Sequence, residues 1–270
     1  MTAGRDLIGT GSSADVWGID DSRVLKLFHP GVIEIPVALE YAAASLASDI
    51  GVAVARPLAR VEEEGRLGII FERVTGPTMF AEMIRRPYRM WPLIRALARY
   101  QVALHGQVPG TVDVIPDMPT VMAHRIARSG AGRDVQARAS MRLASLGTER
   151  RLCHGDLHPA NIVLGETGLF AIDWSKAMIG SPAADAARTE LLIRFGHGGQ
   201  SGTPAPMRFA RALTARWYRF CYSRLSGVKD STIRAWHLPV AVAWYKGQAD
   251  LRAAGLADYI DAIARERHIN

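Results

Sequence analysis

A short hairpin near the middle of the chain constrains the fold most. Two apolar runs, 162–164 and 169–172, read as β-strands, and the turn signal Gly-Glu-Thr-Gly at 165–168 separates them. Strands of this length bring the two ends of a hairpin together, so Asn161 before the first strand and Asp173 after the second should be neighbours. Their amide and carboxylate oxygens are ligands that a hard cation such as Mg²⁺ prefers. The hairpin therefore predicts a magnesium site suited to a phosphate-bearing ligand.

The residues before the first of these strands, HGDLHPAN at 154–161, form a polar loop. Asp156 should lie close enough to the predicted cation site to take a proton from an incoming hydroxyl group. His154 and His158 are further candidates for a metal ligand or a base. A carboxylate and amide pair suits magnesium rather than zinc, however, which argues against a histidine metal site.

The first 75 residues alternate β-like runs with turn signals and contain one helix-forming segment. The β-like runs lie near 7–8, 16–19, 24–28, 54–61 and 67–74. Between the third and the fourth run, the segment VALEYAAASLAS is rich in strong helix formers. Pro36 fits the first turn of this helix, whereas Glu34 should lie outside it. The pattern predicts a small unit of five strands and one helix.

A glycine-rich stretch, IGTGSSADVW at 8–17, joins the first two of these runs. Gly9, Gly11 and Ala14 give it the spacing G-x-G-x-x-A. A dinucleotide-binding fold would open a helix at this point, yet the chain continues as strand, which favours a glycine-rich hairpin lying over phosphates. An ordinary hairpin turn gives the same pattern, so this stretch alone does not establish a nucleotide site.

Lys26 lies in the third run, VLKLF, where strand alternation places it on one face with Val24 and Phe28. A lysine among apolar side chains needs a carboxylate or a phosphate as its partner. Glu40, in the helix that follows, is the natural candidate. The alternative is an edge-strand lysine that points to solvent.

From Thr78 the pattern becomes mainly helical, and the amphipathic segment 91–106 is its clearest helix. Strand patterns return around the polar loop, and helical patterns follow the hairpin to the end of the chain. The exception is the Gly/Ser/Pro-rich stretch 196–206, which is expected to be a flexible connection. We therefore predict an α+β protein with two domains, a β-rich one over 1–75 and a larger, mainly helical one over 76–270.

Charge is divided unevenly between these two parts. Residues 1–75 carry 7 basic and 11 acidic side chains, whereas 76–270 carry 26 and 15, which gives −4 and +11 within the total of +7. The basic part favours anionic ligands, but no basic run interleaved with aromatics predicts a nucleic-acid surface. The two cysteines are too few for a disulfide framework or a zinc site. No apolar run is long enough to span a membrane, and the expected location is cytoplasmic.

The loop HGDLHPAN and the tripeptide IDW at 172–174 together resemble the aminoglycoside phosphotransferase and choline-kinase-like branch of the protein-kinase-like fold. This family has H-G-D-x-H-x-x-N in its catalytic loop and I-D-[FWY] at its metal site. Glycine-rich loop, strand lysine, helix glutamate, hinge, catalytic loop and metal aspartate occur here in family order, so the resemblance covers most of the chain. It implies a bilobal fold with a small N-terminal β-sheet lobe and a larger helical C-terminal lobe.

The resemblance also implies a role for each matching position of the N-terminal part. Main-chain N–H groups of the glycine-rich loop would cover the nucleotide phosphates; the loop consists of Gly9, Thr10, Gly11, Ser12, Ser13 and Ala14. Lys26 would contact the α- and β-phosphates and be held by Glu40. Main-chain groups from Glu72 to Val74 would bind adenine.

In the C-terminal part, the resemblance implies that Asp156 orients the acceptor hydroxyl and accepts its proton. Asn161 and Asp173 would hold Mg²⁺, and the two loop histidines would be structural, forming hydrogen bonds with the loop backbone. Asp185, in the segment SPAADAART, would brace the catalytic loop. The implied cofactor is Mg²⁺ and the implied phosphate donor is ATP, with GTP as a compatible alternative.

The acceptor has no motif of its own. Residues 181–270 carry 13 basic and 7 acidic side chains, net +6, which disfavours a polycationic aminoglycoside unless Asp258 and Asp261 form a local acidic site. Aromatic residues of the C-terminal helices would build either a cage for a quaternary ammonium or, more simply, a helical core. These are Trp217, Tyr218, Phe220, Tyr222, Trp236, Trp244 and Tyr245. Four arginines would either meet an anionic acceptor or form a solvated face; they are Arg208, Arg211, Arg216 and Arg219.

These patterns predict an ATP- and Mg²⁺-dependent phosphotransferase that moves the γ-phosphate to a hydroxyl of a small molecule. An antibiotic-resistance kinase is a more specific alternative. A nucleotide-binding pseudokinase is the alternative from another class, and the intact key positions argue against it. A protein kinase is the least compatible, because no activation segment ending in A-P-E follows Asp173. The expected partners are a nucleoside triphosphate and a small hydroxylated acceptor.

Overall fold

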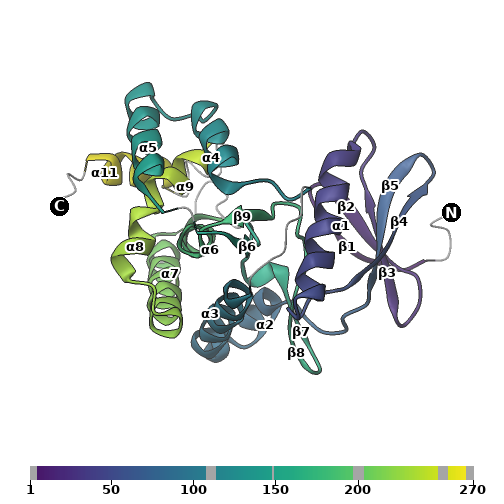
Figure 1. Ribbon diagram of the computed structural model, residues 1–270. Helices are drawn as coiled ribbons and strands as arrows, with labels where there is room; N and C mark the ends of the chain where they lie inside the picture. Colours follow the sequence, from purple (N-terminus) through teal and green to yellow (C-terminus); the bar gives the residue numbers. More distant parts are fainter. Residues whose placement is uncertain (1–4, 108–113, 148, 197–203, 249–254, 266–270) are drawn as a thin grey trace.

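The computed structural model describes residues 5–107, 114–147, 149–196, 204–248 and 255–265. Within these ranges the chain forms an antiparallel N-terminal sheet and a larger, mainly helical C-terminal part (Figure 1). Helix α1 (Glu34–Asp49) lies beside the sheet, on the side that faces the C-terminal part (Figure 1). The predicted α+β class is confirmed.

The N-terminal sheet has five strands in the order β1-β2-β3-β5-β4, and every neighbouring pair is antiparallel. Their bounds are Leu7–Thr10 (β1), Ala14–Gly18 (β2), Arg23–Phe28 (β3), Pro57–Glu63 (β4) and Arg66–Glu72 (β5). The predicted unit of five strands and one helix is confirmed. The glycine-rich stretch joins β1 to β2 as a hairpin, so it does not open a helix as a dinucleotide-binding fold requires.

The start of α1 differs from the prediction. Glu34, expected outside the helix, is its first residue, and its carboxylate pairs with Arg60 of β4. Pro36, at the third position of the helix, is tolerated there because the first N–H groups of a helix have no intrahelical partner. The helix therefore begins two residues before the proline.

The C-terminal part is built around α6 (Pro182–Phe195), a helix whose residues are mostly buried. The elements before α6 are α2 (Met79–Arg85), η1 (Pro87–Arg89), α3 (Met90–Gly106), α4 (Met118–Ala127), α5 (Arg133–Ser145), β6 (Arg151–Cys153), η2 (Pro159–Asn161), β7 (Ile162–Gly165), β8 (Gly168–Ala171) and β9 (Met178–Gly180). Those after it are α7 (Ala205–Ser226), α8 (Asp230–Ala235), α9 (His237–Trp244) and α11 (Leu256–Arg265). Alanines of α6 let the neighbouring helices approach closely and form one core.

The predicted hairpin is present as β7 and β8, and it lies where the two parts of the chain meet. Residues 53–55, which we call the junction segment, connect α1 to β4 in the sequence and run alongside β8. The N–H of Ala171 donates to the carbonyl of Ala53 at 3.2 Å, and the N–H of Ala55 donates to the carbonyl of Ala171 at 3.3 Å. The hydroxyl of Tyr100, on α3, donates to the same Ala53 carbonyl at 2.7 Å.

Most of the C-terminal aromatic residues belong to the core. Tyr218, Tyr222, Trp236 and Tyr245 are buried, which confirms the helical-core interpretation for these four. The stretch 196–206, predicted as a flexible connection, falls largely outside the described residues. In the part of the chain that the structure describes, no helix combines the length and apolarity needed to cross a lipid bilayer.

Candidate active site

The hairpin brings the two predicted cation ligands to one place. Asn161 ends the η2 turn directly before β7, and its carbonyl accepts the N–H of Ile172, the residue before Asp173, at 3.0 Å. The side-chain N–H of Asn161 donates to the carbonyl of Asp156 at 3.0 Å, which leaves the amide oxygen for a ligand. Asp173 has a left-handed φ of 62°, a conformation that residues other than glycine rarely adopt. This conformation sets the direction of its carboxylate.

Lys26 links the sheet, α1 and the hairpin. Its Nζ lies 2.6 and 2.8 Å from the two carboxylate oxygens of Glu40 and 3.0 Å from Oδ1 of Asp173. The Lys26 side chain is only 14% exposed, so the solvent-facing alternative is wrong. Its contact with Asp173 had no signal in the sequence, because the two residues are 147 positions apart.

Burial and shared charge set the ionisation of these three groups. Burial raises the pKa of Glu40 to about 7 against the pull of Lys26. Burial would also raise the pKa of Asp173, but Lys26 and a hydrogen bond from Ser175 outweigh it and hold that pKa at about 2. Burial likewise tends to lower the pKa of Lys26, yet the two carboxylates raise it overall. Lys26 and Asp173 are therefore charged at neutral pH.

Two cations hold the carboxylate of Asp156. Nζ of Lys176 lies 2.7 Å from Oδ2, and Nη2 of Arg188 lies 3.3 Å from Oδ1. Burial alone would raise the pKa of Asp156, but Arg188 and Lys176 outweigh it and lower the value. The carboxylate is therefore ionised and fixed in orientation. Neither partner was predicted, because only the tertiary fold brings the loop after β8 and the second turn of α6 beside the polar loop.

Asp185 at the start of α6 accepts hydrogen bonds from the polar loop. Its Oδ1 accepts the N–H of Gly155 at 2.8 Å, and its Oδ2 accepts the N–H of His154 at 3.2 Å. Side chains of α3 add Gln101 Nε2 at 2.8 Å and His105 Nε2 at 3.1 Å. Burial would raise the pKa of Asp185, but these bonds, His105 foremost, lower it. Asp185 therefore ties the polar loop to α3 and α6.

The histidines of the loop make hydrogen bonds to the backbone. Nε2 of His154 donates to the carbonyl of Ile172 at 3.1 Å, and its Nδ1 accepts the N–H of Asp156 at 3.3 Å. Burial lowers the pKa of His154 despite the surrounding carboxylates, so the ring is neutral in the tautomer that these two bonds require. Nδ1 of His158 accepts the N–H of Ala160 at 3.2 Å and caps the η2 turn.

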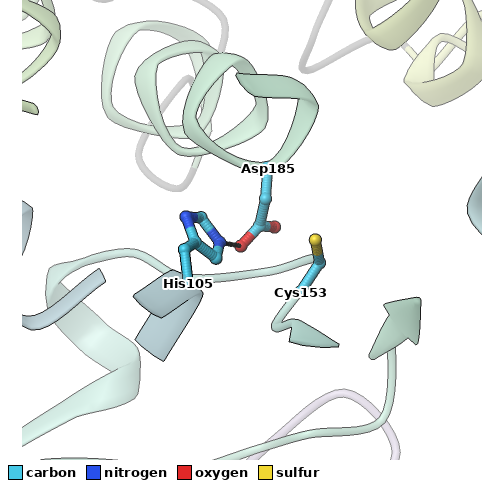
Figure 2. A group of neighbouring side chains, drawn as sticks. All are labelled: His105, Cys153 and Asp185. Atoms are coloured by element: carbon cyan, nitrogen blue, oxygen red, sulfur yellow. Dashed lines mark hydrogen bonds and ion pairs between the residues drawn. The ribbon is translucent and has the colours of Figure 1, made fainter. Parts of the chain in front are cut away.

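Figure 2 shows a buried group of His105, Cys153 and Asp185, whose ligand atoms lie within 4.8 Å of one another. Both nitrogens of His105 are already bonded, Nε2 to Asp185 and Nδ1 to the hydroxyl of Tyr222 at 2.7 Å. Burial raises the pKa of the Cys153 thiol well above its usual value, so the sulfur is protonated. Because both ring nitrogens of His105 are engaged and the thiol of Cys153 keeps its proton, the group does not fit a metal ion.

Some of the main-chain N–H groups that were predicted to bind the nucleotide are already hydrogen bonded within the protein. The N–H of Gly11 donates to the carbonyl of Ala14 at 2.9 Å within the hairpin turn, and the turn residues 10–13 are exposed. At the end of β5, the N–H of Glu72 donates to the carbonyl of Arg56 at 2.8 Å. That N–H is therefore engaged within the protein, and Val74, half-buried at the end of the sheet, lies two residues further on.

Three solved structures that are similar to this chain are named as a phosphotransferase, a kinase and a kinase family protein. A thermostable mutant of aminoglycoside phosphotransferase APH(4)-Ia, in a ternary complex with AMP-PNP and hygromycin B, has a TM-score of 0.70 at 15% identity, over 99% of this chain and 95% of that chain. Amicoumacin kinase hAmiN, with AMP-PNP, Ca²⁺ and Ami, has a TM-score of 0.67 at 13% identity, over 98% and 89%. A choline/ethanolamine kinase family protein from Mesorhizobium loti has 0.65 at 11% identity, over 97% and 88%. The protein-kinase-like fold is confirmed.

The family itself follows from the sequence. Among curated proteins no match is found. The sequence profile of the phosphotransferase enzyme family (APH) matches residues 6–228, which include the glycine-rich hairpin, Lys26, the polar loop, the β7–β8 hairpin and α6. With most of its length and all of these elements matched, the chain belongs to the phosphotransferase enzyme family.

Proposed function

We propose that this protein is an ATP- and Mg²⁺-dependent kinase that transfers the γ-phosphoryl group to a hydroxyl of a small molecule. Residues 1–75 would bind the nucleotide, and residues 76–270 would carry the catalytic loop and the acceptor site. The AMP-PNP complexes of the aminoglycoside phosphotransferase and of amicoumacin kinase support ATP as the donor.

One observation carries this proposal, the meeting of two charged groups from distant parts of the chain. Lys26, paired with Glu40, reaches Asp173 at 3.0 Å, and Asp173 closes the hairpin whose other end is Asn161. Asp156 lies on the loop that leads into the same hairpin and is bonded to Asn161. Phosphoryl transfer requires these parts in this arrangement, namely a phosphate-binding ammonium, oxygen ligands for a metal and a carboxylate beside the acceptor.

Oxygen ligands of the hairpin fit magnesium. Asp173 is ionised, and the amide oxygen of Asn161 is left unbonded by the contact that its nitrogen makes. These two residues would hold Mg²⁺, which, when bound, neutralises charge on the phosphate oxygens. Lys26 would hold the α- and β-phosphates with its ammonium fixed by Glu40. The exposed hairpin turn between β1 and β2 would cover the phosphates, and main-chain groups near Val74 would bind adenine.

Asp156 would orient the acceptor in the chemical step. The acceptor oxygen forms a bond to the γ-phosphorus, the bond from that phosphorus to the β–γ bridging oxygen breaks, and ADP leaves with the electron pair. The hydroxyl proton passes to the carboxylate of Asp156. The lowered pKa makes this carboxylate a weak base, which suits a loose transition state in which positioning contributes more than proton abstraction.

The test is ADP release measured with a coupled assay, together with nucleotide binding measured by fluorescence titration. We expect the wild type to hydrolyse ATP slowly without an acceptor and only with Mg²⁺. Asp156→Asn should lower this rate by about 100-fold or more and retain nucleotide binding. Asp173→Asn should lose the Mg²⁺-dependent part of nucleotide binding.

Asp258→Asn is the matched control, because Asp258 is an exposed carboxylate on α11. It should leave both measurements unchanged. A wild-type rate of ATP hydrolysis in the Asp156→Asn variant would overturn the proposed role of Asp156, and nucleotide turnover that needs no divalent cation would overturn the magnesium site.

A further inference from the structure

A cavity of about 270 Å³ is lined by residues of α4, α6 and α9 and of the segment after β8. Gly155 and Lys176 line it next to the catalytic carboxylate. Apolar side chains make up part of the wall, among them Met118, Met178 and Trp244. This volume is near the lower end for ligand sites, so it suits a compact molecule.

Cations dominate the polar lining of this cavity. Four basic side chains line it, Arg125, Lys176, Arg188 and Lys246. Among the described residues the lining includes one carboxylate, Asp185, whose two oxygens already accept four hydrogen bonds. The charge of Asp185 is therefore used within the protein, and the cavity has positive charge to spare.

Lys176 and Arg188 form ion pairs with Asp156, but Arg125 and Lys246 do not. Neither Arg125 nor Lys246 has an ion-pair partner in the described parts of the chain, and both are exposed residues that line the cavity. A requirement to stabilise the γ-phosphoryl group would explain the two cations at Asp156. It does not explain two more cations on α4 and after α9.

Arg188 adds a second, independent observation. Its Nη1 is buried and has no hydrogen-bond partner within the described residues, although its Nη2 reaches Asp156. Burial lowers the pKa of Arg188 to about 10, with repulsion from Arg125 adding to the decrease and Asp156 opposing it, so the guanidinium is charged at neutral pH. A buried N–H of a charged group without an acceptor is destabilising, and an oxyanion in the cavity would supply that acceptor.

The same wall does not fit a cationic acceptor. The guanidinium of Arg188 lies 4.2 Å from the centre of the Trp244 ring, so a protein cation already occupies one face of this aromatic ring, where a quaternary ammonium would otherwise bind. Asp258 and Asp261, the acids that would favour an aminoglycoside, are exposed on α11 and absent from the described lining. The four arginines singled out in the sequence are not in that lining either, and Arg219 is paired with Glu190 and Asp230.

Resting on the proposed kinase function, we infer that the acceptor is a small hydroxylated anion. Its carboxylate or phosphate group would pair with Arg125, Lys246 and the unbonded edge of Arg188, while its hydroxyl lies beside Asp156. The reaction is the phosphoryl transfer described above, and the anionic group is unchanged by it.

A first experiment measures anion binding without chemistry. Protein saturated with Mg²⁺ and ADP is titrated with sulfate, against chloride at equal ionic strength, and the thermal unfolding temperature is recorded. The wild type should be stabilised by sulfate beyond chloride, and the double variant Arg125→Gln, Lys246→Gln should lose most of that difference. Arg128→Gln, an exposed arginine at the end of α4 that does not line the cavity, is the matched control and should keep it.

A second experiment compares acceptors that differ mainly in charge. ADP release is measured with two sets of acceptors, each containing an anion, a neutral alcohol and a cation. The sets are glycerate, glycerol and serinol, and gluconate, sorbitol and N-methylglucamine. Glycerol phosphate and kanamycin complete the series. The anionic members should have a kcat/KM at least tenfold above their neutral and cationic counterparts. Arg125→Gln should raise the acceptor KM about tenfold with little change in kcat, and Arg125→Lys should recover part of the loss.

The two experiments separate this inference from the proposed function. Equal sulfate responses in the wild type and the double variant would overturn the anionic acceptor, as would a higher kcat/KM for a neutral or cationic member. If no member is phosphorylated, the sulfate titration decides. Wild-type ATP hydrolysis by Asp156→Asn would instead overturn the role of Asp156 in the proposed function and leave the sulfate result standing.

Discussion

The proposed nucleotide side and the proposed acceptor side of Asp156 differ in how their charges are balanced. On the nucleotide side one ammonium, Lys26, is shared by the carboxylates of Glu40 and Asp173. On the acceptor side the cavity wall carries four cations, and the carboxylate in that wall is engaged with the polar loop and α3. One side is short of positive charge, and the other has an excess.

This difference follows from what each proposed ligand brings with it. A nucleoside triphosphate arrives with a divalent cation, so its site needs a spare carboxylate for the metal as well as an ammonium for the phosphates. An anionic acceptor arrives without a counterion, so the protein itself must supply the positive charge. Four substitutions test the two sides and the residue between them.

Lys26→Met should give the largest effect, by breaking the nucleotide side. The change leaves Glu40 and Asp173 facing each other without their cation, and removal of one partner from a buried ion pair destabilises by about 3 to 5 kcal/mol. Denaturant unfolding measured above neutral pH reports the free energy of unfolding. The double variant Lys26→Met, Glu40→Leu should recover part of the loss. A single-variant change below about 1 kcal/mol would contradict the importance of the shared ammonium.

Glu40→Gln should remove a pH dependence from stability. Burial raises the pKa of Glu40 from 4.5 to about 7, so the folded protein binds this proton more tightly than the unfolded chain. That stabilisation is complete below pH 4.5 and is lost as pH rises through about 7. The wild type should therefore lose up to about 3 kcal/mol relative to the variant across this window. Unfolding curves of the wild type and the variant at both ends of the pH window measure this loss. If the two proteins differ in free energy of unfolding by the same amount at both ends, Glu40 stays ionised in the folded protein.

Gly155→Ala should disturb the polar loop between the two sides. Gly155 has a φ of 75°, and a Cβ there would lie 2.1 Å from the carbonyl oxygen of Lys176. Strain of this kind costs about 1 to 3 kcal/mol, and the shift should also lower kcat. Gly132→Ala is the control, because Gly132 has a φ of −62° and no atom within 4 Å of the added carbon. Similar losses in both variants would exclude the predicted clash.

Lys176→Gln should give the smallest effect, on the acceptor side. Loss of this charge should raise the pKa of Asp156, which Arg188 and Lys176 together lower against burial. The acid limb of the pH–rate profile should then move up by about one pH unit, equivalent to about 1.4 kcal/mol. Lys229→Gln removes an exposed lysine at the start of α8 and should leave the profile in place. An unmoved limb in Lys176→Gln would mean that Arg188 alone sets the charge of Asp156.

Local geometry made much of the fold and of the nucleotide side predictable. A short hairpin must bring Asn161 and Asp173 together, and Glu40 lies on the first helix after the strand of Lys26. The position of Glu34 was misread because a proline marks the first turn of a helix only to within a few residues. Strand and helix periodicity sufficed for the N-terminal sheet.

The acceptor side was not predictable in the same way. Lys176 and Arg188 meet Asp156 only after β8, β9 and α6 have packed together, and no residue spacing encodes that contact. Net charge favours anionic ligands, but the four arginines noted in the sequence do not line the cavity, and Arg211 donates to main-chain carbonyls at the C-terminal end of α6. Charge counts along a sequence carry no information on which cations share a cavity.

The junction segment also constrains how the two parts can move. Ala53 and Ala55 are hydrogen bonded to the two polar groups of Ala171, at the end of the hairpin that precedes Asp173. A rotation of the sheet against the helices must therefore either break these two bonds or carry β8 with it. Amide hydrogen exchange at Ala55 and Ala171 consequently reports on opening between the parts, and it does so from a position adjoining the proposed metal ligand.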